Sequence, residues 1–207
     1  MTRVKVCGIT SLGDALAAID AGADMLGFNF YRRSPRYVAP EDARKVVARV
    51  PEVVTCVGVF VNEPAPEDVE RIAREAGLTT VQLHGDESPE YCRSLRALKV
   101  IKALRVGRDF DAETVGEYGT DSVLLDAYVK GERGGTGHTF DWSLAALARA
   151  RVARLFLAGG LTPDNVAAAV AAVRPYAVDV CSGVETSPGR KSPELIRRFV
   201  EAVASSQ

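Results

Sequence analysis

The 207-residue chain lacks the features that would place it in a membrane, outside the cell or on nucleic acid. It has no apolar run long enough to cross a bilayer, and its N-terminus lacks the apolar core of a signal peptide. The net charge of -1 gives no electrostatic reason to bind nucleic acid or a membrane surface. There is also no low-complexity tract or linker. We therefore expect one cytoplasmic domain that spans residues 1–207.

Metal-binding spacings are missing as well. The four cysteines fall on or beside predicted strands and helices rather than in CxxC or Cys/His patterns, so we predict no metal site, and a reducing compartment fits them. The composition, 47% hydrophobic and 26% charged, is that of a globular protein with a full core.

Short apolar runs alternate with segments of helical periodicity along the whole chain, which is typical of parallel βαβ units. Eight such runs predict a (β/α)8 TIM barrel in the α/β class, and a doubly wound open sheet is the alternative. At 207 residues the barrel is short, so we expect short loops and no inserted domain. The expected strands are Val4 to Cys7, Met25 to Phe30, Val54 to Phe60, Thr80 to Leu83, Val100 to Ala103, Ser122 to Asp126, Leu155 to Ala158 and Ala177 to Cys181. The expected helices are Leu12 to Ala21, Pro40 to Val50, Pro66 to Ala76, Pro89 to Leu98, Ala112 to Tyr118, Trp142 to Ala150, Asn165 to Val173 and Pro193 to Ala204.

Two turns of small residues follow the last two expected strands, at Gly159-Gly160 and at Ser182-Gly183. Glycine lets the backbone approach a ligand, and N–H groups at a helix start attract an anion. Each turn alone is compatible with an ordinary loop. As a pair after strands seven and eight of a barrel, they predict a phosphate site.

Catalytic groups of a barrel lie at the carboxyl ends of its strands, where this chain places Cys7 and Asp126. Alternation along the first strand turns Lys5 and Cys7 inward, because Val4 and Val6 must meet the helices. A thiol there acts as a base only as the thiolate, and the alternative is a small buried side chain. A carboxyl held in its protonated form at Asp126 would serve as an acid, and the alternative is a loop cap.

Two loops carry further candidates. The long glycine-rich loop after Asp126, residues 127–141, is a predicted lid or third wall of the phosphate site, with a disordered surface loop as the alternative. In the loop after strand two, Arg36 follows Pro35 and could hold a carboxylate through its fork of donors, or belong to a solvated basic cluster.

The chain closely resembles phosphoribosylanthranilate isomerase, over nearly its whole length and in one order. The matching segments are Lys5 to Thr10, Gly27 to Phe30, Ser34 to Val38, Val57 to Phe60, Gln82 to Gly85, Leu125-Asp126, Gly134 to Gly137, Ala158 to Leu161 and Ser182 to Glu185. The resemblance implies a cofactor-free Amadori rearrangement of N-(5'-phosphoribosyl)anthranilate in tryptophan biosynthesis. The partner is then a small phosphorylated sugar–anthranilate substrate.

The resemblance also implies residue roles. Cys7 maps on the general base, Asp126 on the general acid and Arg36 on the contact to the anthranilate carboxylate. His84 lies in the family's motif Gln82 to Gly85 and faces the mouth without a firm role. Asp179, by contrast, is a candidate because alternation turns it inward on strand eight, where it could form a structural ion pair with inward Lys5 or Lys102, the favoured interpretation, or contact substrate. The implied phosphate-binding residues are Gly135, Gly137, Gly159, Gly160, Ser182 and Gly183.

Other interpretations stay open. A sugar-phosphate epimerase or the histidine-pathway isomerase would share the barrel, but the latter pairs two aspartates where this chain has Cys7. A non-catalytic phosphometabolite sensor would need no Cys7 and Asp126 together, and an interaction protein would expose a large apolar surface. Alternation along strand eight also turns Cys181 inward, on the strand next to that of Cys7, so oxidation could join the two thiols in a disulfide. The sequence is compatible with a monomer or a homodimer.

Overall fold

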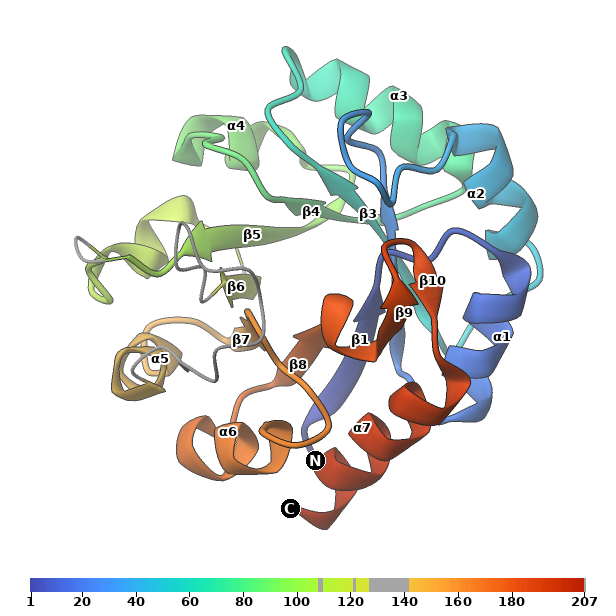
Figure 1. Ribbon diagram of the computed structural model, residues 1–207. Coiled ribbons are helices and arrows are strands. Elements are labelled where there is room, and N and C mark those ends of the chain that lie inside the picture. Colours follow the sequence, from blue (N-terminus) through green and yellow to red (C-terminus); the bar gives the residue numbers. More distant parts are fainter. Residues whose placement is uncertain (108–109, 121, 127–141, 207) are drawn as a thin grey trace.

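The computed structural model describes residues 1–107, 110–120, 122–126 and 142–206. Its centre is a closed barrel of eight parallel strands in the order β1 to β8, closed by pairing of β1 with β8, and the helices surround it (Figure 1). The predicted (β/α)8 barrel is therefore confirmed, and the alternative of an open sheet is wrong. The strands are β1 Arg3–Cys7, β2 Met25–Asn29, β3 Thr55–Phe60, β4 Thr80–Leu83, β5 Lys99–Arg105, β6 Ser122–Asp126, β7 Arg154–Ala158 and β8 Ala177–Val180.

The helices follow the strands as expected, with several shorter than the periodicity predicted. They are α1 Leu12–Asp20, α2 Pro40–Val47, α3 Pro66–Ala76, α4 Pro89–Ser94, α5 Trp142–Arg149, α6 Val166–Val173 and α7 Pro193–Ser205. Ser88 and Ser192 cap α4 and α7, and each side chain accepts a backbone N–H from the first turn. Helix α2 ends at Val47, before the predicted end at Val50. Val50 precedes Pro51, and the residue before a proline disfavours helical geometry.

The predicted fifth helix, Ala112 to Tyr118, is wrong in type. The structure has a short 3-10 helix, η1, at Thr114–Tyr118, which ends at Gly119 with a φ of 65°. Gly116 within five residues leaves too little helix-forming sequence for an α-helix to be sustained.

Two apolar layers hold the strands in place. Alternate side chains of each strand face the helices and form the larger core, which includes Val4, Val6, Leu83 and Leu125. The opposite set fills the barrel interior. Its buried members are Met25, Val57, Ile101, Ala103, Leu124, Phe156, Ala158 and Ala177. Lys5, Gln82 and Asp179 are buried polar side chains of this interior, each at the third position of its strand.

A hairpin after β8 was not predicted. It consists of β9, Glu185–Ser187, and β10, Arg190–Lys191, which pair antiparallel around Pro188-Gly189 after the short 3-10 helix η2, Ser182–Val184. Strands of three and two residues are too short to leave a hydrophobic period in the sequence, although a Pro-Gly pair is a turn signal. The hairpin brings Glu185 and Lys191 to the site.

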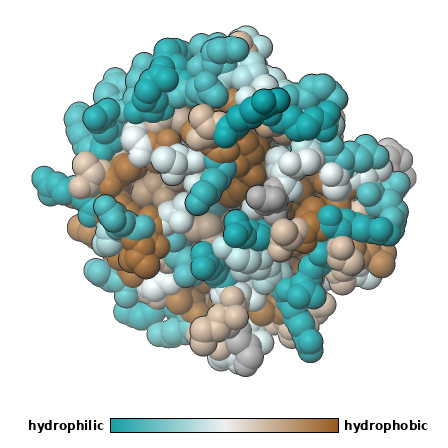
Figure 2. All heavy atoms as spheres, turned by 180° about the vertical axis from the view of Figure 1, so that it is seen from behind, coloured by the Kyte–Doolittle hydropathy of each residue, from teal (hydrophilic) through white to brown (hydrophobic). Residues whose placement is uncertain are grey.

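The outer surface carries mostly polar side chains. Figure 2 shows hydrophilic side chains around the face seen from behind, with separate apolar patches between them. Within the described ranges, no helix has both the length and the apolar character needed to span a membrane.

Candidate active site

Cys7 ends β1 inside the mouth of the barrel and is 8% exposed. Its thiol lies against Gly27 of the neighbouring strand, where an added Cβ would be 2.8 Å from Cys7 Sγ and 3.1 Å from Lys5 Nζ. Gly27 therefore provides the space that the thiol and the ammonium group share. Lys5 and Cys7 both face inward, as the alternation along β1 predicts.

Lys5 and Asp179 form a buried ion pair across the β1–β8 junction. The two residues are register partners, and Lys5 Nζ lies 2.8 Å from Asp179 Oδ1. Burial opposes the charge on Lys5, but Asp179 and Cys7 outweigh it and raise the lysine pKa. Burial also raises the pKa of Asp179, to about 6, against the lowering effect of Lys5. Both partners are therefore charged at neutral pH, and the predicted structural pairing of Asp179 is observed with Lys5.

Lys102, the other predicted partner of Asp179, lies elsewhere. The interior residues of β5 are its neighbours Ile101 and Ala103, so Lys102 faces the helix layer. There its ammonium group lies 2.6 Å from Glu87 Oε2, with both side chains buried. The apolar run of β5 has no clean alternation, which is why the sequence did not show which face Lys102 occupies.

The Cys7 thiol is next to a second thiol, that of Cys181. A hydrogen bond from Cys181 lowers the pKa of Cys7, burial raises it, and the charges of Lys5 and Lys191 lower it further, with a net result well below the usual value. For Cys181 the direction is opposite, because its hydrogen bond to Cys7 and its burial both raise the pKa. The two thiols thus titrate as a coupled pair, in which the neighbouring groups lower the pKa of Cys7 and raise that of Cys181.

Asp126, at the end of β6, is joined to His84 just after β4. His84 Nε2 lies 3.1 Å from Asp126 Oδ2, and His84 Nδ1 lies 2.7 Å from Gln82 Nε2. Gln82 is fully buried, while His84 and Asp126 are each about a quarter exposed. His84 also lies close enough to Asp179 for its charge to act on that carboxyl. The buried amide fixes the imidazole, and the imidazole fixes the partly solvated carboxyl.

Arg36 is held by a carboxylate of the protein itself. Arg36 Nε lies 2.9 Å from Glu185 Oε1, and Nη2 lies 2.7 Å from Glu185 Oε2, in a two-pronged contact. Lys191 Nζ adds a third contact, 2.9 Å from Glu185 Oε1. Burial opposes the charged form of Glu185, but these donors outweigh it and lower the glutamate pKa. Arg36 is therefore an ordered side chain beside the thiol pair and not part of a solvated cluster.

The two predicted glycine turns meet. A Cβ added at Gly183 would overlap the carbonyl oxygen of Leu161, so the turn after β8 packs directly on the turn after β7. Gly159 and Gly160 have φ values of 90° and 63°, which a side chain would strain. A Cβ at Gly160 would meet nothing within 4 Å, so open space lies beside that turn. Ser182 begins η2 beside it.

The remaining predicted phosphate residues, Gly135 and Gly137, lie outside the described residues, as does the whole loop 127–141. Within the described part of the chain, no group of three or more His, Cys, Asp or Glu side chains has the arrangement of a metal site.

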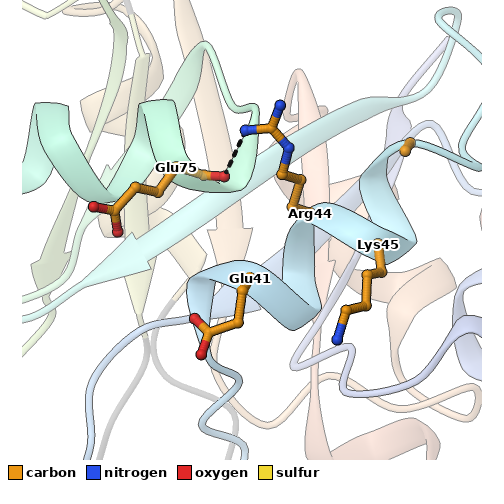
Figure 3. Close-up of a pocket in the computed structure, with 5 residues that line it drawn as sticks. Glu41, Arg44, Lys45 and Glu75 are labelled. Carbon is orange, nitrogen blue, oxygen red and sulfur yellow. Dashed lines mark hydrogen bonds between the residues drawn. The ribbon is translucent and has the colours of Figure 1, made fainter.

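A separate surface groove shares no residue with this site. It has a volume of about 610 Å³ and lies between α2, which contributes Glu41, Arg44 and Lys45, and α3, which contributes Glu75 (Figure 3). Arg44 Nη1 donates to the Glu75 carbonyl across the groove. Its exposed, mixed charges do not form a site for one ligand.

Three side chains of the site were not predicted from the residues. Glu185 and Lys191 belong to the β9–β10 hairpin, which places them at the site. Gln82 lies two residues before His84 and points to the same side of the strand. The period of two in Gln82-Leu83-His84 is the signal that could have identified Gln82 as a partner of His84.

Comparison with known proteins gives one consistent result. The family model of N-(5'phosphoribosyl)anthranilate (PRA) isomerase matches residues 4–202. The N-(5'-phosphoribosyl)anthranilate isomerase of Trichlorobacter lovleyi is 52% identical over 200 residues, which are 97% of each chain.

Solved structures agree with this match. The phosphoribosylanthranilate isomerase of Thermotoga maritima is similar with a TM-score of 0.92 and 47% identity, over 99% of this chain and 100% of that one. A second solved isomerase structure holds reduced 1-(o-carboxyphenylamino)-1-deoxyribulose 5-phosphate. It is 45% identical with a TM-score of 0.89, over 99% of this chain and 100% of that one.

Proposed function

Because the chain belongs to the N-(5'-phosphoribosyl)anthranilate isomerase family, we propose that Cys7 and Asp126 are the base and the acid of its reaction. The activity itself follows from the family: an aldose–ketose isomerisation in tryptophan biosynthesis. The substrate is N-(5'-phosphoribosyl)anthranilate, and the product is 1-(2-carboxyphenylamino)-1-deoxyribulose 5-phosphate. The catalytic and binding roles of individual residues are proposed below.

The acid step belongs to Asp126. Its carboxyl group gives a proton to the ribose ring oxygen, the ring opens, and the substrate nitrogen forms a Schiff base with C1'. His84, held by Gln82, keeps the carboxyl in place 3.1 Å away. A carboxyl that is a quarter exposed can regain its proton from water between turnovers.

The base step belongs to Cys7. Its thiolate removes the proton from C2', and the resulting enolamine tautomerises to the ketone. The observation that carries this assignment is the thiol's setting: a buried Cys7 flanked by Lys5 and Cys181, which lower its pKa. A thiol of ordinary pKa would be mostly protonated at neutral pH and unable to take a proton.

Binding residues lie on either side of these two groups. Arg36 uses Nε and Nη2 on Glu185, and we assign its Nη1 to the anthranilate carboxylate. The joined turns at Gly159-Gly160 and Ser182-Gly183 hold the phosphate, with Gly135 and Gly137 as the further predicted contacts. Asp179 acts through Lys5 and does not touch substrate. The chain acts as one domain, because strands from its two ends pair to close the barrel.

The test is the fall of anthranilate fluorescence as freshly made phosphoribosylanthranilate is consumed without added metal or cofactor. We expect Cys7→Ala and Asp126→Asn each to lower kcat by roughly 10²–10⁴-fold, the usual contribution of a positioned acid or base. Cys56→Ala is the matched control, because this half-buried thiol has a pKa raised to about 11 by burial alone and lies outside the site. It should keep its activity within about twofold, by the small effect expected away from the chemistry. Full activity in either site variant would refute that residue's role, and an inactive wild type that binds a product analogue would indicate a sensor.

A further inference from the structure

We propose that Cys181 is a positioning residue for the reaction: its thiol donates a hydrogen bond to Cys7 Sγ and so maintains the thiolate. This inference rests on the proposed role of Cys7 as the base. It assigns a function to a side chain that neither binds substrate nor takes part in the proton transfers described above.

The first support is the strand register. Lys5 pairs with Asp179 and Val6 with Val180, so the next positions along β1 and β8 are Cys7 and Cys181. Paired positions on neighbouring strands lie about 4.8 Å apart, which brings two inward thiols into hydrogen-bond range. Cys181 then leaves the strand with φ -127° and ψ -84°. A Cβ added at Gly8 would be 3.0 Å from Cys181 Sγ, so the second thiol covers the backbone directly after Cys7.

The second support is that the other acceptor of the Cys181 thiol, Glu185 Oε1, is distant and already occupied. Cys181 Sγ also lies 3.9 Å from Glu185 Oε1, at the long limit of a sulfur hydrogen bond. That oxygen already accepts from Arg36 Nε at 2.9 Å, Lys191 Nζ at 2.9 Å and Gly189 N at 3.3 Å. With Glu185 supplied by stronger donors, the Cys181 proton is directed to Cys7.

The third support is that Lys5 alone is a weak partner for a thiolate. Its ammonium group is already 2.8 Å from Asp179, so most of its charge is compensated. A buried thiolate then needs another donor, because burial without one favours the neutral thiol. The charged and titratable groups that act on Cys7 are Lys5, Asp179, Cys181, Lys191 and Arg36.

The side chain of Cys181 is itself kept in place from the hairpin. Lys191 Nζ donates to the Cys181 carbonyl at 3.0 Å and lies 3.8 Å from its sulfur. Lys191 is fully buried and anchored on Glu185. The hairpin thus fixes the backbone that presents the second thiol, and the orientation of the hydrogen bond does not depend on substrate.

The experiment is the rate of Cys7 alkylation by iodoacetamide from pH 5 to 9, followed by mass spectrometry of the Cys7 peptide. It compares wild type with Cys181→Ala, which lacks a donor, and Cys181→Ser, which keeps one. The other two thiols do not interfere at neutral pH, because burial raises the pKa of Cys56 and of Cys92 to about 11. The pH profile of kcat/KM is measured on the same proteins.

We expect Cys181→Ala to lower the Cys7 alkylation rate at pH 6.5 by about tenfold, the effect of losing one hydrogen bond to a charged group. The alkylation midpoint and the acid limb of kcat/KM should both move to higher pH, and Cys181→Ser should restore most of the change. An unchanged midpoint in Cys181→Ala would overturn the proposal, as would an equal shift in the serine variant. If the alkylation midpoint moves while the kcat/KM profile does not, the hydrogen bond is supported and Cys7 is not the base.

Discussion

The buried ion pair between Lys5 and Asp179 allows the sharpest test of how the barrel mouth is built. Asp179→Asn would leave the Lys5 ammonium, fully buried, without its counter-ion 2.8 Å away. Removing one partner of a buried pair costs about 3–5 kcal/mol in stability, since the remaining charge has lost both water and its partner. For a chain of this size, that corresponds to a fall in melting temperature of roughly 6–20 °C.

The assay is urea unfolding of four proteins: wild type, Asp179→Asn, Lys5→Met and the double variant. The double variant should be markedly more stable than the sum of the single losses predicts, because an apolar side chain and a neutral amide leave no unpaired charge. Asp42→Asn is the control. Its pair with Lys45 is shorter, at 2.6 Å, but both side chains are exposed, so the urea midpoint should not change.

The contribution of Asp179 to folding stability changes with pH in the opposite direction to that of an ordinary carboxylate. Burial raises the folded-state pKa of Asp179 to about 6, above its unfolded value, so the folded chain binds this proton more tightly. The contribution of Asp179 is therefore most favourable below the unfolded pKa and is lost as pH rises to about 6. A loss below 1 kcal/mol for Asp179→Asn at pH 7, with no coupling in the double variant, would refute the argument that this pair is buried and ionised.

Two further predictions concern the Cys7 thiol. Gly27→Ala would place a Cβ 2.8 Å from Cys7 Sγ and 3.1 Å from Lys5 Nζ, so kcat should fall by at least about tenfold while the protein stays folded; unchanged kcat in the fluorescence assay would show that the thiol is not confined there. Peroxide should oxidise the Cys7 thiolate to a sulfenic acid with release of hydroxide, and the Cys181 thiol should then form a disulfide with release of water. Without Cys181, a second peroxide oxidises the sulfenic acid to a sulfinic acid with release of water, and dithiothreitol does not reduce that product. Activity should therefore return with dithiothreitol in wild type and not in Cys181→Ala, and the idea fails if the two behave alike.

The sequence predicts the barrel well because short apolar runs alternate with segments of helical periodicity, of which only the one before β6 proved to be a 3-10 helix within the described residues. It also places Cys7 and Asp126 at strand ends, and it predicts that Lys5 and Asp179 face inward, since charged side chains on those strands alternate with valines. The register of β1 against β8, which brings Lys5 to Asp179, is not contained in either strand alone. It follows from closure of the whole barrel.

Local contacts near the mouth were harder to foresee. Glu185 and Lys191 lie in strands too short to show a period, and the contact of Glu185 with Arg36 links segments 149 residues apart. Lys102 lies in the run Val100-Ile101-Lys102-Ala103-Leu104, where neighbours on both sides are apolar and the face is undetermined. Helix ends such as that of α4 depend on tertiary packing, here the burial of Leu95.

Closure of the barrel through β1 and β8 also affects when the enzyme can work during its synthesis. The ribosome makes Cys7 among the first residues, yet Asp179, which pairs with Lys5, and Cys181, which we propose supports the thiolate, emerge more than 170 residues later. A nascent or truncated chain that ends before β8 has the Cys7 thiol without the ion pair and the second thiol beside it. Catalytic competence therefore arises only once translation has passed the last strand, and incomplete chains carry an ordinary, unactivated cysteine.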